Sequence, residues 1–312
     1  MGRFIRDMLL LLFTFLVCYL TVMALLCSIA PQGVPLVYRI GDYLNFKGGN
    51  SYRKFQEFER DSVYDVVFIG SSHAFRGYYP EFFARGGYTS FNLGSSGQSP
   101  MNSYFILDAY LNKANTKLVL LDVFEGAMER DGLESTADLS QNIGSDRAAA
   151  GMALALQDPR AVNMLTLRWM RRDAPPMYAD DDYRPGGSSW RSDSVRTRIH
   201  YRKGHPFKPH EQQVRYLRKC LQWCRDEGVP LVLVNHPYPH QSDHAKHAQF
   251  NAMLRTLTEE FNVPYIDMAY DHDLDDEDHF YDHNHLNSAG VERFNARLIP
   301  RLVEAGHLPQ RP

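Results

Sequence analysis

The feature that most constrains this chain is a series of short apolar runs separated by stretches of helical periodicity. The runs cover residues 64–69, 90–93, 117–121, 230–234 and 264–268, and the helix-like stretches lie near 99–114, 210–226, 243–260 and 288–305. Apolar strands alternate with helices in this way when a parallel sheet is covered on both faces. The pattern therefore predicts an α/β fold, a three-layer sandwich built on a five-stranded parallel sheet.

The charge balance restricts the partners of the chain. It carries 34 Lys and Arg residues against 37 Asp and Glu residues, which gives a formal net charge of −3. Nucleic-acid-binding domains normally show a clear excess of basic side chains. We therefore expect no nucleic-acid partner.

The length of 312 residues suits one large domain with a tail. We expect a membrane anchor in residues 1–31, a membrane-proximal neck in 32–62 and a single domain in 63–312. Within that domain, residues 127–208 break the regular pattern with an Ala-rich helix and a polar, Arg-rich loop. We interpret them as an insertion over the sheet, either a lid or a surface on which a partner docks.

The N-terminal segment contains 23 consecutive residues without a charge, 8–30, preceded by Arg3 and Arg6. A helix rising about 1.5 Å per residue crosses a hydrocarbon core of about 30 Å with this length. Basic flanks stay on the cytoplasmic side. We therefore expect a single-pass anchor, with the domain that follows outside the cytoplasm.

Two other interpretations of this segment stay open. A cleaved signal peptide would have a shorter apolar run, and Pro31 would obstruct cleavage after Ala30. A lipoprotein site at Cys27 would need small residues where Leu25 and Leu26 stand. Both interpretations fit less well than a retained helix.

Ligands of parallel α/β sheets bind at the carboxyl ends of the strands. That rule directs the search to residues 70–76, 94–98, 122–126 and 235–238. The first of these segments begins with Gly70-Ser71-Ser72-His73, which places a hydroxyl in a sharp turn directly after a strand. A serine becomes a nucleophile only when a base accepts its proton.

A candidate base lies near the other end of the chain, in Asp282-His283-Asn284-His285. An aspartate three residues before a histidine can accept the Nδ1 proton and leave Nε2 free for the serine. His73 is the competing base. Because adjacent residues on a turn point apart, we prefer His285, and we predict Ser72, His285 and Asp282 as catalytic residues.

These motifs resemble the SGNH (GDSL-like) hydrolase superfamily over residues 64–126 and 229–303. Gly70-Ser71-Ser72-His73 is similar to its nucleophile block, and Asp282-x-x-His285 to its closing block. Residues 92–99 resemble the second block, where Gly97 matches the glycine whose N–H contributes to the oxyanion hole. The resemblance implies the flavodoxin-like SGNH fold and serine-dependent acyl-ester chemistry without a cofactor.

The anchor and the fuller string from Phe68 to Gly77 resemble a membrane-anchored branch of that superfamily. The branch includes the D-alanyl-lipoteichoic acid biosynthesis protein and exopolysaccharide O-acetylation proteins. The resemblance implies a bacterial cell-membrane protein whose outer domain acylates a cell-surface glycopolymer beside a membrane-bound O-acyltransferase. Transfer and hydrolysis both remain open.

One departure from the family pattern concerns the oxyanion hole. The third block normally supplies an asparagine, but this chain has Asp122-Val123-Phe124-Glu125-Gly126 after the third run. We expect Asn235 or the backbone N–H groups of Ser72 and Gly97 to replace that donor. Loss of one oxyanion donor costs about 3–4 kcal/mol of transition-state stabilisation. Because such a loss would slow catalysis strongly, a second hypothesis stays open, in which the chain is a non-catalytic glycan-binding or scaffold subunit.

The remaining candidates are histidines and one arginine. We assign His73, Arg76 and His236 to substrate binding, with Arg76 suited to a phosphate or carboxylate or else to a structural ion pair. The stretch with His236, His240, His244 and His247 could suggest a metal. Two prolines interrupt the stretch, and histidines on a surface loop explain it equally well, so we expect no metal site.

Overall fold

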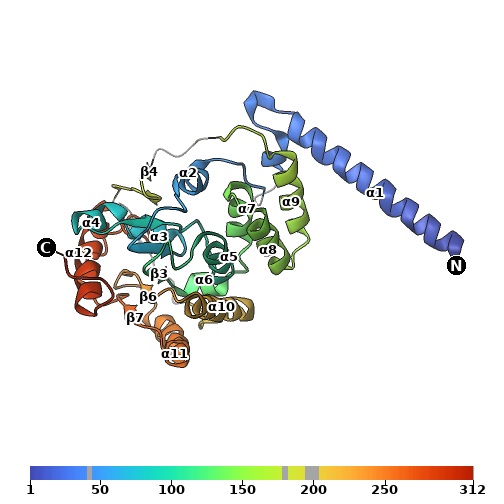
Figure 1. Cartoon of the computed structure of the whole chain (residues 1–312). Coiled ribbons are helices and arrows are strands. Elements are labelled where there is room, and N and C mark those ends of the chain that lie inside the picture. The colour runs from blue at the N-terminus through green and yellow to red at the C-terminus, as the bar shows by residue number, and fades with distance from the viewer. Residues whose placement is uncertain (41–43, 178–181, 194–203, 312) are drawn as a thin grey trace.

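The computed structural model describes residues 1–40, 44–177, 182–193 and 204–311 (Figure 1). Its centre is a five-stranded sheet in the order β2-β1-β3-β6-β7, in which every pair of neighbours is parallel. The strands are β1 (Val66–Ile69), β2 (Ser90–Asn92), β3 (Val119–Asp122), β6 (Leu231–Asn235) and β7 (Tyr265–Asp267). The predicted α/β class and strand count are confirmed.

Alternate residues of the strands enter two separate hydrophobic cores. Val67, Ile69 and Val119 face one core, which is covered by α5 (Pro100–Tyr110), α10 (Glu211–Glu227) and α11 (His244–Phe261). Val66 and Phe68 face the other, covered by α3 (Ser72–Gly77), α4 (Pro80–Arg85) and α12 (Ser288–Glu304). Both faces of the sheet are therefore buried, as continuous apolar strands require.

The region expected to be an insertion contains three helices and a β-ribbon. After the short α6 (Glu125–Glu129) come α7 (Leu133–Asn142), α8 (Asp146–Leu156) and α9 (Arg160–Met170). The helix α8 packs on α5, and α7 packs on α2 (Gly49–Glu57) of the expected neck. The ribbon pairs β4 (Tyr183–Arg184) with β5 (Ser188–Ser189), and part of the predicted polar loop, 194–203, lies outside the described residues.

The ribbon covers the outer edge of the sheet. The carbonyl oxygen of Gly186 accepts a hydrogen bond of 2.8 Å from the N–H of Asn92 in β2. The hydroxyl of Tyr79 donates to the carbonyl oxygen of Ser189. An unpaired edge strand is a site of aggregation, so this part of the region protects the sheet.

The N-terminal helix α1 (Gly2–Ser28) projects from the body of the molecule (Figure 1). Its most apolar window has a mean hydropathy of 2.7 and is only 6% buried, so the helix is long and apolar enough to cross a membrane. A signal sequence at an N-terminus meets the same criteria. Two short 3-10 turns, Pro31–Gly33 and Leu36–Arg39, lead from α1 toward the domain.

Candidate active site

The turn that carries Ser72 is fixed by a close backbone approach. Gly70 follows β1 with a φ of 148°, and a Cβ there would lie 2.8 Å from the Cβ of Asp122. The chain then enters α3, whose first residue is Ser72 and whose N-cap is Ser71. Only glycine combines this dihedral with so little space. The partly exposed Ser72 is thereby held at the carboxyl end of β1.

A buried amide ties α3 to the neighbouring strand. The Asn92 side chain donates to the carbonyl oxygens of Ala74 and Tyr78, each at 2.8 Å, and accepts from the N–H of Gly94 at 2.9 Å. One side chain therefore fixes both the helix that carries Ser72 and the loop that approaches it. The sequence motif at 92–99 does not by itself reveal this role.

Ser72, His285 and Asp282 form a continuous chain of hydrogen bonds. The Ser72 Oγ lies 2.8 Å from Nε2 of His285, and Nδ1 of His285 lies 2.9 Å and 3.0 Å from the two carboxylate oxygens of Asp282. A carboxylate only accepts, so Nδ1 carries the proton and Nε2 is left to accept from the serine. The structure thus brings together three side chains from opposite ends of the chain.

Burial keeps this histidine neutral. Desolvation is the main cause that lowers the pKa of His285, and it outweighs the opposing effect of Asp282. Burial raises the pKa of Asp282, but the hydrogen bond to His285 and the positive charge of that ring when it is protonated prevail, so the pKa of the carboxyl is lowered. The pair therefore consists of a carboxylate and a neutral imidazole at neutral pH, the state that a general base needs.

The His285 ring lies between two other rings. The ring of Tyr281 is nearly parallel to it, 13° apart, with a centroid distance of 5.3 Å. The His73 ring lies 4.6 Å away. The hydrogen bonds and the two rings together limit rotation of the imidazole.

A cavity of about 90 Å³ opens beside the Ser72 hydroxyl. Its walls include Ser72, Gly97 and His285, together with Phe124 and Ala127. The N–H groups of Ser72 and Gly97 donate no hydrogen bond to another described residue. They are therefore available to an oxyanion formed in this cavity.

The expectation for Asn235 is not met. Its amide donates to the carbonyl oxygen of Val123 at 2.9 Å and to the hydroxyl of Tyr238 at 3.1 Å. Both amide hydrogens are therefore used inside the protein, because a strand-end asparagine is drawn into the nearest backbone acceptor. Of the expected oxyanion donors, the backbone N–H groups of Ser72 and Gly97 remain.

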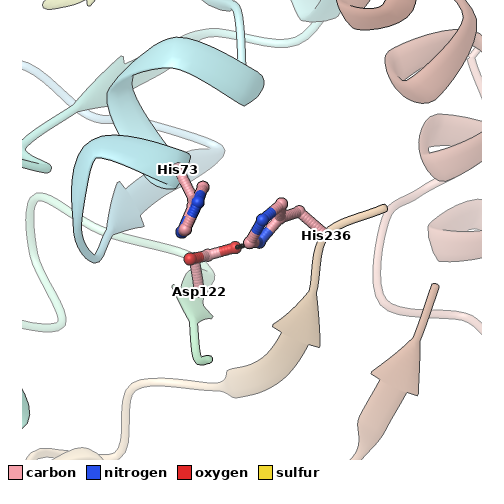
Figure 2. A group of neighbouring side chains, drawn as sticks. All are labelled: His73, Asp122 and His236. Carbon is pink, nitrogen blue, oxygen red and sulfur yellow. Dashed lines mark hydrogen bonds and ion pairs between the residues drawn. The ribbon is translucent and has the colours of Figure 1, made fainter. Parts of the chain in front are cut away.

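Next to Ser72 lies a buried cluster of His73, Asp122 and His236 (Figure 2). His73 lies in α3, Asp122 is the last residue of β3 and His236 directly follows β6. The rings of His73 and His236 stack at 3.7 Å. Asp122 accepts from Tyr78 at 2.8 Å and pairs with Nδ1 of His236 at 3.1 Å. Burial, followed by the neighbouring histidines His236 and His285, holds the pKa of His73 well below its ordinary value.

The burial of this cluster bears on the substrate-binding roles expected for His73 and His236. His73 is 2% exposed and reaches only the small cavity beside Ser72. His236, also 2% exposed, lies behind it and lines neither that cavity nor the larger cleft described below, so its assignment to substrate binding is not supported. Burial against Asp122 and His73 is the physical reason.

The cluster is also the place where a metal ion would be sought. One ligand atom from each residue lies within 4.8 Å of the others, and His73 Nε2, His236 Nε2 and Asp122 Oδ1 have no hydrogen-bond partner within the described part of the chain. Imidazole lone pairs lie in the ring plane, and two rings stacked at 3.7 Å do not direct them to one point. The rings would have to rotate before these residues held one ion.

The interpretation of the other histidines as surface residues is wrong for His247. It is buried, 2.6 Å from Glu125 and 3.2 Å from Asp267. Desolvation opposes its charge, but hydrogen bonds to the two carboxylates prevail and raise the pKa of His247 to about 9. His240 and His244 are exposed, as expected for a surface loop.

A larger cleft of about 970 Å³ is lined in part by Phe75 and Arg76 of α3. Its wall is mainly polar and includes Lys54, Arg76, Glu134, Asp182, Trp190 and Arg191. Arg76 lies 3.8 Å from Asp182 and over the ring of Tyr281 at 5.6 Å, so it joins this cleft to the ring that stacks on His285. Arg76 thus meets both expectations, because it forms an ion pair with Asp182 and also lines an open cleft.

Sequence reasoning missed Lys54. This side chain is 1% exposed, donates to the carbonyl oxygen of Gly94 and lies 4.9 Å over the ring of Phe75. Desolvation lowers its pKa to about 7. Lysine in a polar helix normally faces solvent, so no pattern in the sequence marks it as a support for the loop at Gly94.

Comparison with known proteins finds similarity only among solved structures. No family model matches the chain, and no curated protein matches it. A GDSL-like lipase from Bacteroides thetaiotaomicron is 11% identical over 77% of this chain and 88% of that chain, with a TM-score of 0.41.

Two further structures are similar to the same extent. An acetylxylan esterase from Geobacillus stearothermophilus is 11% identical over 78% of this chain and 96% of that chain, with a TM-score of 0.41. A lipase/acylhydrolase from Enterococcus faecalis is 12% identical over 80% of this chain and 100% of that chain, with a TM-score of 0.39. Identities and TM-scores this low say nothing about the activity of this chain.

Proposed function

We propose that this chain is a serine esterase or O-acyltransferase with Ser72, His285 and Asp282 as its catalytic triad. The observation that carries the proposal is the unbroken hydrogen-bond chain from Ser72 through His285 to Asp282. An adjacent cavity with two backbone donors supports it. The SGNH-like sequence blocks around Ser72 and His285 point to the same chemistry.

In the first half-reaction, the Ser72 oxygen attacks the ester carbonyl carbon while its proton moves to Nε2 of His285. The N–H groups of Ser72 and Gly97 stabilise the oxyanion, and Asp282 stabilises the imidazolium. The intermediate then expels the alcohol, which takes the proton from His285. Ser72 is left as an acyl ester.

In the second half-reaction, His285 takes a proton from an incoming hydroxyl, whose oxygen attacks the acyl carbonyl carbon. The tetrahedral intermediate then expels the Ser72 oxygen, which takes the proton back from Nε2 of His285, so the product ester or acid is released and the free serine is restored. Water gives hydrolysis, and a sugar or polyol hydroxyl gives transfer. The polar cleft supports a glycan acceptor, because Trp190 can stack on a sugar ring and Glu134 and Asp182 can accept from hydroxyls.

The size of the cavity beside Ser72 supports a short acyl group. A volume of about 90 Å³ bounded by Phe124 and Ala127 has room for an acetyl group but not for a long chain. We expect the full-length protein to turn over p-nitrophenyl acetate at least about tenfold faster than p-nitrophenyl octanoate. Equal rates for both esters would contradict this assignment.

The catalytic proposal is tested with the full-length protein in detergent. A fluorophosphonate should label the wild type and not Ser72→Ala, and the variant should lose p-nitrophenyl acetate turnover. Ser71→Ala is the matched control, because it changes the neighbouring hydroxyl that caps α3. Unlabelled wild type, or a fully active Ser72→Ala, would exclude this mechanism.

The same proposal includes a place in the bacterial cell. We propose that α1 is retained as a membrane anchor, with the domain outside the cytoplasm and beside a membrane-bound O-acyltransferase that acylates a surface glycopolymer. The support is Arg3 and Arg6 before the charge-free run. All four native cysteines lie within α1 or are buried, so Val63→Cys is a selective site for a membrane-impermeant thiol reagent in intact cells.

A second candidate function is a non-catalytic glycan-binding or scaffold subunit of an acylation complex. The observation in its favour is Asp122 in place of a donor, together with the engagement of Asn235 elsewhere. Cells that depend on this protein for polymer acylation distinguish the two functions. A scaffold with Ser72→Ala would still support acylation, whereas a catalyst would not.

A further inference from the structure

A small basic pocket lies between α2, the end of α7 and the end of α9, and one of its wall residues, Arg171, also contacts Cys27 of α1. It has a volume of about 250 Å³, and its wall includes four basic side chains and one carboxylate. The charged residues are Lys47, Asp146, Arg168, Arg171 and Arg172. It shares no wall residue with the cavity beside Ser72 or with the large cleft.

The single carboxylate does not balance the pocket's positive charge. Asp146 pairs with Arg168 at 2.6 Å and with Arg172 at 3.2 Å. Arg168 also donates to the carbonyl oxygens of Ser140 and Ile143, so its donors are used within the protein. Lys47, Arg171 and Arg172 are left with donors and charge for a ligand.

Arg171 provides an independent sign of a missing acceptor. Its Nε is buried and has no hydrogen-bond partner among the residues that the structure describes, while one of its terminal nitrogens reaches the carbonyl oxygen of Cys27 at 3.4 Å. A buried guanidinium N–H without an acceptor costs free energy, which a rotation of the Arg171 guanidinium toward an anion in the pocket would recover. The pocket therefore suits an anion with several oxygen atoms.

The position of the pocket identifies the source of that anion. Cys27 lies near the end of the charge-free run 8–30, at the level where a spanning helix leaves the hydrocarbon core. Trp169, next to the wall residue Arg168 on α9, is 67% exposed, and Arg172 follows shortly after the end of that helix. Exposed tryptophan next to basic residues is typical of the membrane interface.

We propose that this pocket binds the phosphate group of an anionic phospholipid headgroup in the outer leaflet. The inference rests on the proposed anchoring by α1. Lys47, Arg171 and Arg172 supply the donors, and Asp146 and Arg168 hold the pocket wall. Bound lipid would fix the orientation of the domain relative to the membrane.

The test uses the full-length chain in nanodiscs of equal phosphatidylcholine and phosphatidylglycerol, with native mass spectrometry of the lipid retained after release. We expect the wild type to retain phosphatidylglycerol in preference. The double variant Lys47→Gln/Arg172→Gln should lower that preference about thirtyfold, as loss of two charges at about 1 kcal/mol each near a lipid surface implies. The matched control Arg85→Gln/Arg218→Gln removes two exposed arginines, on α4 and α10, that do not line the pocket, and it should leave the preference unchanged.

A second arm separates the two possible sources of phosphate. Titration of the detergent-solubilised chain with inorganic phosphate should show weak binding at most. Tight binding of inorganic phosphate without lipid retention would overturn the lipid assignment, and no difference between the two double variants would overturn the site.

Two further readouts keep the outcomes distinct. Alkaline extraction reports whether α1 is inserted, so failure of the anchor is recognised separately. Turnover of p-nitrophenyl acetate should be unchanged in Lys47→Gln/Arg172→Gln, because neither residue lines the catalytic cavity. A wild type that is inserted and active but retains no anionic lipid would contradict this inference alone.

Discussion

Hydrogen bonds link Asp282 to Ser72 through His285. Asp282 accepts the Nδ1 proton of His285 and also accepts backbone N–H groups of Asn284 and His285 at 3.0 Å and 2.9 Å. These bonds close a tight turn that places the carboxylate beside Nδ1 of the ring. The turn explains why an Asp-x-x-His spacing is sufficient to orient the base.

Replacement of this carboxylate tests that role. Asp282→Asn should lower kcat about 10⁴-fold, because the amide favours the wrong imidazole tautomer. Fluorophosphonate labelling rates and p-nitrophenyl acetate turnover should fall together. Asp271→Asn, which changes a surface ion pair with Arg297 and Arg301, is the control and should retain normal turnover. Comparable losses in both variants would contradict the assignment.

The pH dependence of turnover follows from the burial of His285. Burial lowers the pKa of this histidine from its ordinary value of 6.5, so the imidazole is already neutral at pH 7. We expect kcat/KM for p-nitrophenyl acetate to rise through one ionisation below pH 6.5 and to stay level up to about pH 8. A rise centred above pH 7 would show that another group controls the reaction.

At the level of elements, the loop between β2 and α5 delivers the Gly97 N–H to the cavity. Gly97 has a φ of 59°, and a Cβ there would lie 2.8 Å from the Glu134 carboxylate. Lys54 and Asn92 hold the same loop through Gly94. The oxyanion donor therefore depends on supports from α2, α7 and β2.

Gly97→Ala should disturb this loop and lower kcat by about 10²-fold or more, as loss of one oxyanion donor does. Gly306→Ala is the matched control, since Gly306 also has a left-handed φ of 75° but open space around it. The control should lose some stability but keep its kcat. If Gly97→Ala keeps wild-type kcat, the Gly97 N–H is not an oxyanion donor.

A buried ion cluster joins α11 to the strand ends. His247 on α11 lies between Glu125 and Asp267, and its pKa is raised to about 9. A raised pKa means that the stabilisation is fully present below the unfolded value near 6.5 and is lost as the pH rises through about 9. The shift corresponds to a free energy on the order of 3 kcal/mol.

His247→Gln should therefore lower the stability at pH 6 and flatten its decline between about pH 6.5 and 9. Chemical unfolding of the full chain at several pH values provides the measurement. The exposed His240 offers the comparison, because His240→Gln should leave the slope unchanged. An unchanged slope in His247→Gln would mean that another group sets this pH dependence.

Across the whole molecule, α9 connects the N-terminal helix to the catalytic domain. Tyr19 of α1 donates to Asn163 of α9 at 2.8 Å, and the fully buried Leu167 packs in one cluster with Met23 and Cys27. The domain is thus held to α1 by side-chain contacts as well as by the chain itself. Figure 1 shows α9 beside the end of α1 that leads into the domain.

Leu167→Ala should weaken this junction by about 2–5 kcal/mol, the usual cost of truncating a buried leucine. Hydrogen exchange of the full chain in nanodiscs should speed up in α9, while β1 and β3 keep their protection. Leu154→Ala, on the exposed side of α8, is the control and should change little. Uniform loss of protection would show that the junction and the core unfold as one unit.

The parallel sheet and the positions of the site were predictable from the sequence because both depend on local pattern. Apolar strand runs determine burial on both faces, and a Gly-Ser-Ser-His turn after the first strand together with Asp-x-x-His before the last helix selects Ser72, Asp282 and His285. The rule that sites lie at the carboxyl ends of parallel strands supplied the link between them.

Only the tertiary structure decided which polar side chains turn inward. Asn235 bonds to the neighbouring strand, His236 and His247 are buried against carboxylates, and Lys54 supports a loop forty residues away in the sequence. Such partners are distant along the chain, and burial of a polar group depends on finding them. A local pattern reports the residue type but not the partner, which is why these roles appear only after the chain has folded.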